Sequence, residues 1–421
     1  MNGGILFLIL FVTLILGIPV YGAIGFTCII YMISNNIDMY MLVQRMYSGI
    51  DKMSLIALPG FIIAGNLMDT GGLAKRLVSF CEMFVTKITG GLAIVSIGAS
   101  AFFGAISGSS VATTAAIGGL MLPELKKRNY PGGYCASLAA AGGILGGIIP
   151  PSIGLVIYGA ATGTSITDLF KAGVSVGLFM ALSAMVLSYF YSKKHHYVSE
   201  PKQYTFKKVV VTTKEALFAL GAPVIILGGI FSGLFTPTEA AIVAIIYSLI
   251  VCGLVYKELT WKKIWDIISK SAVTSAAILI ITAVATLFGW IVAYEKIPQA
   301  ILGVVTSVTS SKYVVLLMIN FFLIIAGMFM NGTSIVLITA PILVPLAASM
   351  SINPVHFGIM VMANLSIGNL SPPFGTCLYT GSMISGEPVE TVAKHLVPFM
   401  LVYIVDILIV MVIPWIALCL V

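Results

Sequence analysis

The sequence predicts an all-α polytopic membrane protein made of two related halves. Three observations lead to this fold class: few charges, long apolar runs, and polar breaks that recur in both halves. Of the 421 residues, 59% are hydrophobic and 9% are charged, whereas a soluble domain carries about a quarter charged residues. Residues 4–33, 172–191 and 396–421 are almost free of charge. Each run has the length that a helix needs to cross about 30 Å of hydrocarbon.

The first apolar segment, residues 1–33, is interpreted as a retained span. It lacks the basic start and the small-residue cleavage site of a signal peptide. The six cysteines and four histidines are scattered without metal or disulfide spacing, and no nucleotide-binding motif is present. The net charge of +7 comes from basic residues in short loops, which is typical of cytoplasmic loops and does not indicate nucleic-acid binding.

An internal repeat relates residues 1–191 to residues 215–421, and a polar segment at 192–214 is the predicted cytoplasmic linker. A shift of 222 residues superimposes several helix breakers in the same order: Pro123 on Pro345, Gly146 on Gly368, Pro150-Pro151 on Pro372-Pro373, and Gly159 on Gly381. The motifs SGSS at 107–110 and NGTS at 331–334 match with a shift of 224. Breakers that agree in kind and order indicate a duplication.

The basic residues predict that the two halves face opposite ways. Lys126, Lys127 and Arg128 follow the SGSS motif, but the matching segment 349–354 has no basic residue. Because Lys and Arg concentrate on the cytoplasmic side, this asymmetry favours an inverted repeat. It also places the N-terminus in the cytoplasm and the C-terminus in the periplasm.

Each half is predicted to contain a re-entrant hairpin and a broken helix. The hairpins cover about 91–122 and 313–349, with SGSS and NGTS near their tips. The broken helices cover about 134–168 and 355–385, interrupted at GGIIPPS and GNLSPPF, and a C-terminal span follows the second. A full membrane crossing through SGSS remains the alternative to the first hairpin.

The four breaks are the predicted binding site. Unpaired backbone groups are tolerated in a membrane only where protein buries them or where they line a cavity. Proline frees a carbonyl one turn earlier, which exposes carbonyls near 146–148 and 368–370. Carbonyl and hydroxyl oxygens suit a small cation such as Na⁺, and helix N-termini suit a carboxylate. Close helix packing through small residues is the competing interpretation of the individual glycines.

Two further features receive structural interpretations. Thr236, Pro237 and Glu239 stand at the N-cap, N1 and N3 positions of a capping box that starts a span. Asp406 lies deep in an apolar run, where pairing with another protein group is favoured over a role in proton coupling.

The motifs GAISGSSVAT, GGIIPPS, GLFTPTEAA and GNLSPPFGT resemble the large membrane subunit of tripartite ATP-independent periplasmic (TRAP) transporters. The resemblance extends over essentially the whole chain. It implies a bacterial or archaeal inner-membrane permease that is not an enzyme. It also implies an elevator-type fold, with a scaffold and a transport domain. The expected substrates are organic acids such as C4-dicarboxylates, keto acids and sialic acids.

The same resemblance implies two partners: a small four-span membrane subunit and a soluble extracytoplasmic substrate-binding protein. Because no further span precedes Met1, the small subunit is expected to be a separate polypeptide. No cofactor is implied, and Na⁺ is the coupling ion.

A stand-alone sodium–dicarboxylate symporter of similar plan is the alternative. An intramembrane serine hydrolase using Ser109 or Ser110 is disfavoured, because no histidine lies in apolar sequence at comparable depth. A passive channel is disfavoured too.

The resemblance also assigns residues. One sodium site would join three serines of the first hairpin tip with the backbone of the first break: Ser107, Ser109, Ser110, Gly147 and Pro150. The other would join the second tip with the second break: Asn331, Gly332, Thr333, Asn369, Pro372 and Thr376. The substrate would lie between the tips, near Ser109, Thr113, Ser152, Asn331, Ser371 and Thr376.

Overall fold

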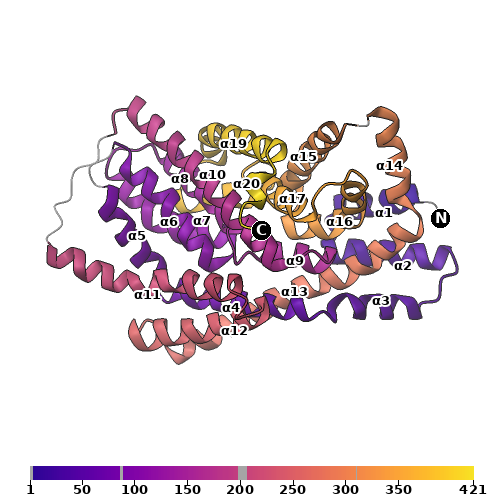
Figure 1. Cartoon of the computed structure of the whole chain (residues 1–421), viewed down its shortest axis with the longest axis horizontal. Helices are drawn as coiled ribbons and strands as arrows, with labels where there is room; N and C mark the ends of the chain where they lie inside the picture. Colours follow the sequence, from indigo (N-terminus) through magenta and orange to yellow (C-terminus); the bar gives the residue numbers. More distant parts are fainter. Residues whose placement is uncertain (1–2, 86–88, 198–205, 310) are drawn as a thin grey trace.

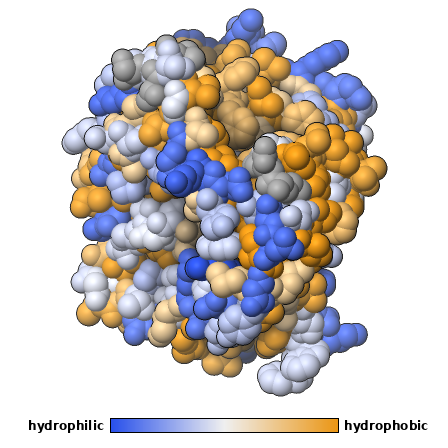
Figure 2. Space-filling model, turned by 90° about the vertical axis from the view of Figure 1, so that its right-hand side faces the viewer, coloured by the Kyte–Doolittle hydropathy of each residue, from blue (hydrophilic) through white to orange (hydrophobic). Residues whose placement is uncertain are grey.

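The computed structural model describes residues 3–85, 89–197, 206–309 and 311–421, and every regular element in these ranges is a helix (Figure 1). Within these ranges, eight helical segments are long and apolar enough to cross a membrane. Large apolar side chains remain exposed on the outside: Leu8 on α1 is 62% exposed, and Val304 on α14 is 66% exposed. Figure 2 shows one end of the molecule, where extensive hydrophobic surface is interrupted by hydrophilic groups. Such a surface suits contact with lipid.

The N-terminal segment forms two helices, so the prediction of one span over residues 1–33 is wrong. Helix α1 covers Gly3–Ile15 and α2 covers Val20–Ser34. Gly17 between them has a φ of +80°, a left-handed conformation that ends α1, and Pro19 then precedes the first turn of α2. The two helices pack together and against α13.

A layer of helices runs along the lower side of Figure 1 and supports the rest of the molecule. Its long member, α13, covers Trp261–Tyr294, whereas the apolar sequence alone predicts a span over 272–293. Helix α3 packs on α13, and α4 packs on α12. The bounds of the remaining elements outside the hairpins and half-helices are Tyr40–Ile50 (α3), Met53–Ile56 (η1), Ala57–Thr70 (α4), Leu73–Val85 (α5), Phe206–Phe231 (α11), Pro237–Ser248 (α12), Leu249–Val255 (η3) and Ile297–Val308 (α14).

The polar motifs of the first half lie where helices meet. Helices α6 (Gly91–Ser107) and α7 (Ser110–Lys126) join at SGSS. After α8 (Gly132–Gly143) and the short η2 (Ile144–Gly147), the double proline precedes α9 (Ile153–Thr162). Because α9 ends at Thr162, the last residues of the segment predicted to reach 168 belong to α10 (Ile166–Lys194).

The second half repeats this order. Helices α15 (Lys312–Phe329) and α16 (Gly332–Ser349) join at Met330 and Asn331. Helix α17 (Pro354–Gly368) ends before the second double proline, and α18 (Thr376–Ser385) follows it. Helices α19 (Val389–Val412) and α20 (Trp415–Leu418) complete the chain. Both Pro150-Pro151 and Pro372-Pro373 have cis peptide bonds.

The predicted linker at 192–214 is helical at both ends, because α10 extends to Lys194 and α11 begins at Phe206. Its middle part, 198–205, lies outside the described residues.

The core is formed where the two halves interleave. Helix α9 of the first half packs on α16 of the second, and α18 of the second half packs on α7 and α8 of the first. Large side chains fill this region, including the fully buried Tyr134, Tyr158 and Tyr403. The hydroxyl of Tyr403 on α19 donates to the Ala141 carbonyl on α8 at 2.8 Å. The half-helices that follow the two double prolines therefore pack in one shared core.

Candidate transport site

Each of the four breaks joins the C-terminus of one helix to the N-terminus of another. They connect α6 with α7, η2 with α9, α15 with α16, and α17 with α18. A helix C-terminus leaves carbonyl groups without intrahelical partners, and an N-terminus leaves N–H groups. The four C-termini can therefore offer oxygens to a cation, and the four N-termini can offer donors and a positive dipole end to an anion.

The first hairpin tip lies directly on the first double proline. Gly108 at the tip has a φ of +62°, and its carbonyl accepts a hydrogen bond from Ile153 N at 3.3 Å. A Cβ on Gly108 would lie 2.2 Å from the Pro151 carbonyl oxygen. Both the left-handed conformation and the contact with backbone require glycine here.

The hydroxyl groups predicted for the first site lie together at this tip. Ser107 Oγ is 2.8 Å from Thr113 Oγ1. Ser109 is the N-cap of α7, and its Oγ accepts from Ala112 N at 3.4 Å. Ser110 Oγ donates to the Ile144 carbonyl at 3.5 Å, which links the tip to η2.

Gly147 and Ser152 join the same neighbourhood from the side of the break. A Cβ on Gly147 would lie 2.5 Å from Ser110 Oγ. Ser152 is the N-cap of α9, and its Oγ donates to the Gly147 carbonyl at 2.6 Å. The Gly147 carbonyl, one of those that the proline is expected to free, thus already has one partner and keeps a second lone pair.

The second tip and the second break are joined through the backbone. Phe374 N donates to the Met328 carbonyl at 3.0 Å. Asn331 is the N-cap of α16, and its Oδ1 accepts from Thr333 N at 3.0 Å. The Asn369 carbonyl at the end of α17 accepts from Cys377 N at 3.1 Å. Among the described residues, no hydrogen bond joins Asn331 directly to Asn369.

Two predicted residues of α18 and its preceding loop have different surroundings. Ser371 is buried, and its Oγ lies 3.8 Å from the sulfur of Met400 on α19. Thr376 is the first residue of α18 and is half-buried. The structure therefore places Ser371 against α19, whereas Thr376 lies at a helix N-terminus.

The two breaks differ in accessibility. Pro150, Pro151 and Ser152 are buried, whereas Pro372 and Pro373 are exposed and Phe374 is 64% exposed. The two breaks are nevertheless close, because a Cβ on Gly147 would lie 3.2 Å from Ser366 Oγ on α17. The first break is thus enclosed by its hairpin tip, and the second is open to its surroundings.

A buried pair of amides between α15 and α17 is not predicted from the sequence. Asn364 is fully buried, and its Nδ2 donates to Asn320 Oδ1 at 2.8 Å. Asn364 Oδ1 is buried without a hydrogen-bond partner. The available signal is an asparagine within each apolar helix, since buried amides require partners.

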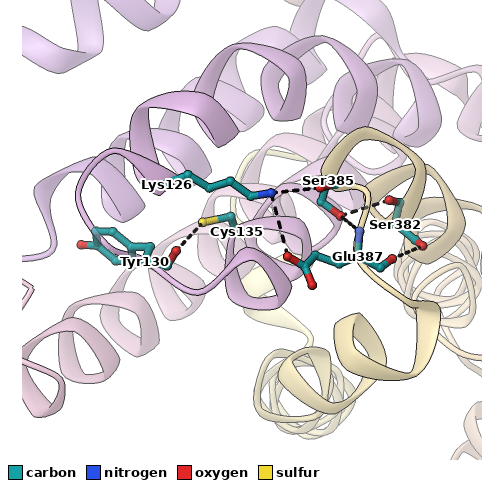
Figure 3. Close-up of polar contacts among 6 residues, drawn as sticks. All are labelled: Lys126, Tyr130, Cys135, Ser382, Ser385 and Glu387. Carbon is teal, nitrogen blue, oxygen red and sulfur yellow. Dashed lines mark hydrogen bonds and ion pairs between the residues drawn. The ribbon is translucent and has the colours of Figure 1, made fainter.

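A polar cluster ties the two halves together at the far end of α18 (Figure 3). Lys126 Nζ at the end of α7 donates to the Ser385 carbonyl at 3.0 Å and lies 3.9 Å from Glu387 Oε1. Ser382 Oγ donates to the Glu387 carbonyl at 2.6 Å. The lysine therefore stabilises the C-terminal end of α18, where a cation is favourable.

Arg45, Arg76 and Asp406 each contact another side chain. Arg45 lies over the Trp290 ring, and Arg76 pairs with Glu258 at 3.6 Å. Asp406 is buried and accepts from Ser183 Oγ at 2.5 Å. The ranges that the structure describes contain no group of three or more His, Cys, Asp or Glu residues that could hold a metal ion.

The N-terminus of α12 contains the capping box that the sequence predicts. Thr236 Oγ1 accepts from Glu239 N at 3.3 Å, and Glu239 Oε2 accepts from Thr236 N at 2.8 Å. Pro237 occupies the first turn. The motif TPTEAA thus begins a helix, as expected of these residue types.

Two solved structures share the fold. The YdaH transporter of Alcanivorax borkumensis has a TM-score of 0.63 at 16% identity, covering 89% of this chain and 87% of that chain. MtrF of Neisseria gonorrhoeae has a TM-score of 0.51 at 15% identity, covering 89% and 83%.

Sequence relatives cover almost the whole chain. The sialic acid TRAP transporter large permease protein SiaM of Vibrio cholerae is 37% identical over 94% of this chain and 93% of its own length. The C4-dicarboxylate large permease protein DctM of Pseudomonas aeruginosa is 38% identical over 89% and 88%. The isethionate TRAP transporter permease protein DctMQ of Oleidesulfovibrio alaskensis is 36% identical over 95% of this chain, which spans 63% of that longer relative.

The family model of the tripartite ATP-independent periplasmic transporter DctM component matches residues 7–416. The relatives are permease subunits and not enzymes. The chain therefore belongs to the DctM component family of tripartite ATP-independent periplasmic transporters.

Proposed function

We propose that this chain is the large permease subunit of a sodium-gradient-driven importer of organic acids. The observation that carries the proposal is the meeting of four helix C-termini and four helix N-termini at the breaks of one interleaved core. Carbonyl and hydroxyl oxygens at the C-termini suit Na⁺, and N-termini suit an organic carboxylate. None of the three arginines lies at a break, so backbone N–H groups, hydroxyls and amides bind the anion.

The substrate class is supported by the relatives. They are named for sialic acid, C4-dicarboxylates, isethionate and, in Escherichia coli, 2,3-diketo-L-gulonate. Isethionate is a sulfonate, and the other substrates are organic acids that carry a carboxylate. The family assignment favours a multi-subunit importer over a stand-alone symporter. In this proposal a small membrane subunit and an extracytoplasmic binding protein act with the chain in the inner membrane.

The hairpins are re-entrant in this proposal. The N-terminus of α6 and the C-terminus of α7 are the outer ends of the first hairpin, and both lie near the C-terminal end of α10. Gly90 N donates to Tyr197 O at 3.3 Å, and the Tyr130 hydroxyl lies 3.3 Å from Ser192 Oγ. A pair of helices whose outer ends share one side of the molecule enters and returns on that side. The interleaved hairpins and half-helices then move as one transport domain against the lower layer of helices.

Uptake into proteoliposomes tests the coupling. The purified permease, its small subunit and its binding protein are needed, with radiolabelled succinate and N-acetylneuraminate as probes. Accumulation should follow an inward sodium gradient and stop when an ionophore removes that gradient. Uptake that requires ATP, or that proceeds equally without the sodium gradient, contradicts the proposal.

Matched substitutions test the assigned sites. Asn331→Ala should raise the sodium concentration needed for half-maximal uptake, whereas Asn353→Ala should not. Asn353 caps α17 through Val355 N at 2.9 Å, so both variants lose an N-cap but only one lies at a break. Ser107→Ala should likewise raise the sodium concentration needed for half-maximal uptake, whereas the control Ser137→Ala should not. Ser137 is a buried serine of α8 that donates to the Tyr134 carbonyl at 2.8 Å and does not lie at a break. Equal sodium dependence within both pairs would refute the assignment.

A further inference from the structure

A large cleft lies apart from the four breaks, at the opposite end of α9. Its volume is about 840 Å³, within the range of small-molecule binding sites. Three segments line it: the chain entering η1, the turn between α9 and α10, and the N-terminus of α12. A second cavity of about 310 Å³ adjoins α13 and α16, and Lys52 lines both.

Lys52 holds the end of a half-helix. Its Nζ donates to the Ala160 carbonyl at 2.7 Å, in the last turn of α9. This contact parallels that of Lys126 with the Ser385 carbonyl at the end of α18. Each half-helix that follows a double proline therefore ends on a lysine, which is favourable at the negative end of the helix dipole.

The two lysines differ in what else they bind. Lys126 also pairs with Glu387, whereas Lys52 forms no ion pair with any residue in the described ranges. Glu239 lines the same cleft, but its carboxylate accepts two hydrogen bonds from Thr236. Burial lowers the pKa of the Lys52 ammonium, since the charge is partly removed from water without a counter-ion. A carboxylate is the partner that this cation lacks.

Hydroxyl donors surround the same space. Ser54 and Thr167 line the cleft, and neither hydroxyl has a hydrogen-bond partner in the part of the chain that the structure describes. Thr167 lies in the first turn of α10, whose N-terminus carries a partial positive charge. One cation and two free hydroxyl donors favour an anionic ligand with polar substituents.

The cleft opens on the side opposite the basic loops. Helix α10 has 29 residues and separates the turn beside Lys52 from Lys193 and Lys194 at its other end. The Tyr130 hydroxyl lies near Ser192, which brings the loop of Lys126–Arg128 to that same basic end. Because basic loops are cytoplasmic, the cleft faces the outside, from which a substrate arrives.

We propose that Lys52 and the surrounding cleft form an entry site that binds the carboxylate of an incoming organic anion. The inference rests on the proposed substrate class but not on sodium coupling. The Lys52 ammonium has three N–H donors, so the carboxylate binds to those that the Ala160 carbonyl does not use. Lys52 thereby keeps its contact with the end of α9.

Amine labelling measures this binding directly, without transport. The full chain, purified in lipid nanodiscs, reacts briefly with an acetylating reagent, and mass spectrometry quantifies acetylation of each lysine. Succinate, pyruvate and N-acetylneuraminate are added as sodium salts, with sodium chloride and sodium sulfate at equal ionic strength as controls. At least one carboxylate should protect Lys52 saturably. Lys171 at the same end of α10 should stay unprotected, because it pairs with Asp168 at 3.7 Å and does not line the cleft.

Three outcomes overturn the proposal: no protection of Lys52 by any of the three carboxylates, equal protection by chloride or sulfate, or equal protection of Lys171. These results do not depend on a sodium gradient, so they are distinguishable from failure of sodium-driven uptake.

Uptake kinetics give a second readout. Lys52→Met should raise KM by about tenfold or more, since a hydrogen bond to a charged group contributes about 1.5 kcal/mol or more. The maximal rate should change less, because the cleft lies apart from the four breaks. Lys52→Arg should restore most of the affinity, and Lys171→Met should behave as the unmodified chain. An unchanged KM in Lys52→Met contradicts the entry site.

Discussion

Replacing Gly108 by alanine tests the closest approach between the first hairpin tip and a double proline. Gly108 has a φ of +62°, and a Cβ there would lie 2.2 Å from the Pro151 carbonyl oxygen. Real Cβ contacts are never so short, so the tip must move. The neighbouring atom belongs to the backbone, which cannot turn aside as a flexible side chain could.

The size of the effect follows from three contributions. A left-handed alanine costs about 1 to 2 kcal/mol. Overpacking against a fixed neighbour costs about 1 to 3 kcal/mol. The lower entropy of the unfolded chain returns about 0.4 to 1 kcal/mol. Gly108→Ala should therefore destabilise the fold by about 1 to 5 kcal/mol.

Gly119→Ala is the matched control, because Gly119 lies in α7 of the same hairpin and a Cβ there would meet nothing within 4 Å. Alanine is favoured over glycine inside a helix by about 1 kcal/mol, so this variant should be as stable as the original or more so. Thermal unfolding of both purified variants in detergent, followed by intrinsic fluorescence, provides the comparison. If Gly108→Ala unfolds at the same temperature as Gly119→Ala, the tip does not lie on the double proline.

Three further substitutions test contacts away from the breaks. Lys126→Met should lower the unfolding temperature more than Lys127→Met, because Lys126 joins α7 to α18, whereas Lys127 forms an exposed ion pair with Glu124. Equal shifts in unfolding temperature would contradict a stabilising contact between α7 and α18. Ser183→Ala should destabilise the fold by about 1 to 3 kcal/mol, because the buried Asp406 carboxylate loses its hydrogen bond from Ser183. A double-mutant cycle with Asp406→Asn that shows no coupling energy would refute this role of Ser183. Thr236→Ala should lower the free energy of unfolding by about 0.5 to 2 kcal/mol, because α12 loses its N-cap, and the same unfolding assay measures this loss. A Thr236→Ser variant that is no more stable than Thr236→Ala would contradict the role of the hydroxyl as the cap.

The positions of the breaks could be predicted because their causes are local. Gly108 ends α6 through its own conformation, and the double prolines lack the N–H groups that would continue a helix. The capping box at Thr236 is likewise formed by residues that lie within four positions of one another in the sequence. Such signals depend on a residue and its immediate neighbours, so a single sequence contains them.

The limits of helices away from the breaks are less predictable. The basic segment 257–263 is the expected loop before the span at 272–293, but α13 begins at Trp261. Charged residues do not end a helix; they only make its first turns unsuited to hydrocarbon. The reverse error occurs at Gly17, where an apolar run conceals a turn between two helices.

Contacts between distant segments away from the breaks could not be predicted. Asn320 pairs with Asn364, and Lys52 reaches Ala160 across more than a hundred residues of chain. Neither pair has a sequence signature, because the partners are chosen by how α15 meets α17 and how the chain entering η1 meets α9. The candidate site is therefore predictable as a set of breaks, whereas the atoms that each break faces depend on the fold.

The exchange of half-helices explains how separate breaks can act together. Helix α9 begins at the first double proline and packs on α16, which begins at the second hairpin tip. Helix α18 begins after the second double proline and packs on α7, which begins at the first tip. A ligand that orders the second tip therefore restricts α9, which packs on α16, and a ligand that orders the first tip restricts α18, which packs on α7. In the proposed transport site, restricting either helix would lower the conformational entropy that remains to be lost when a second ligand binds. Positive cooperativity between the two proposed sodium sites would follow.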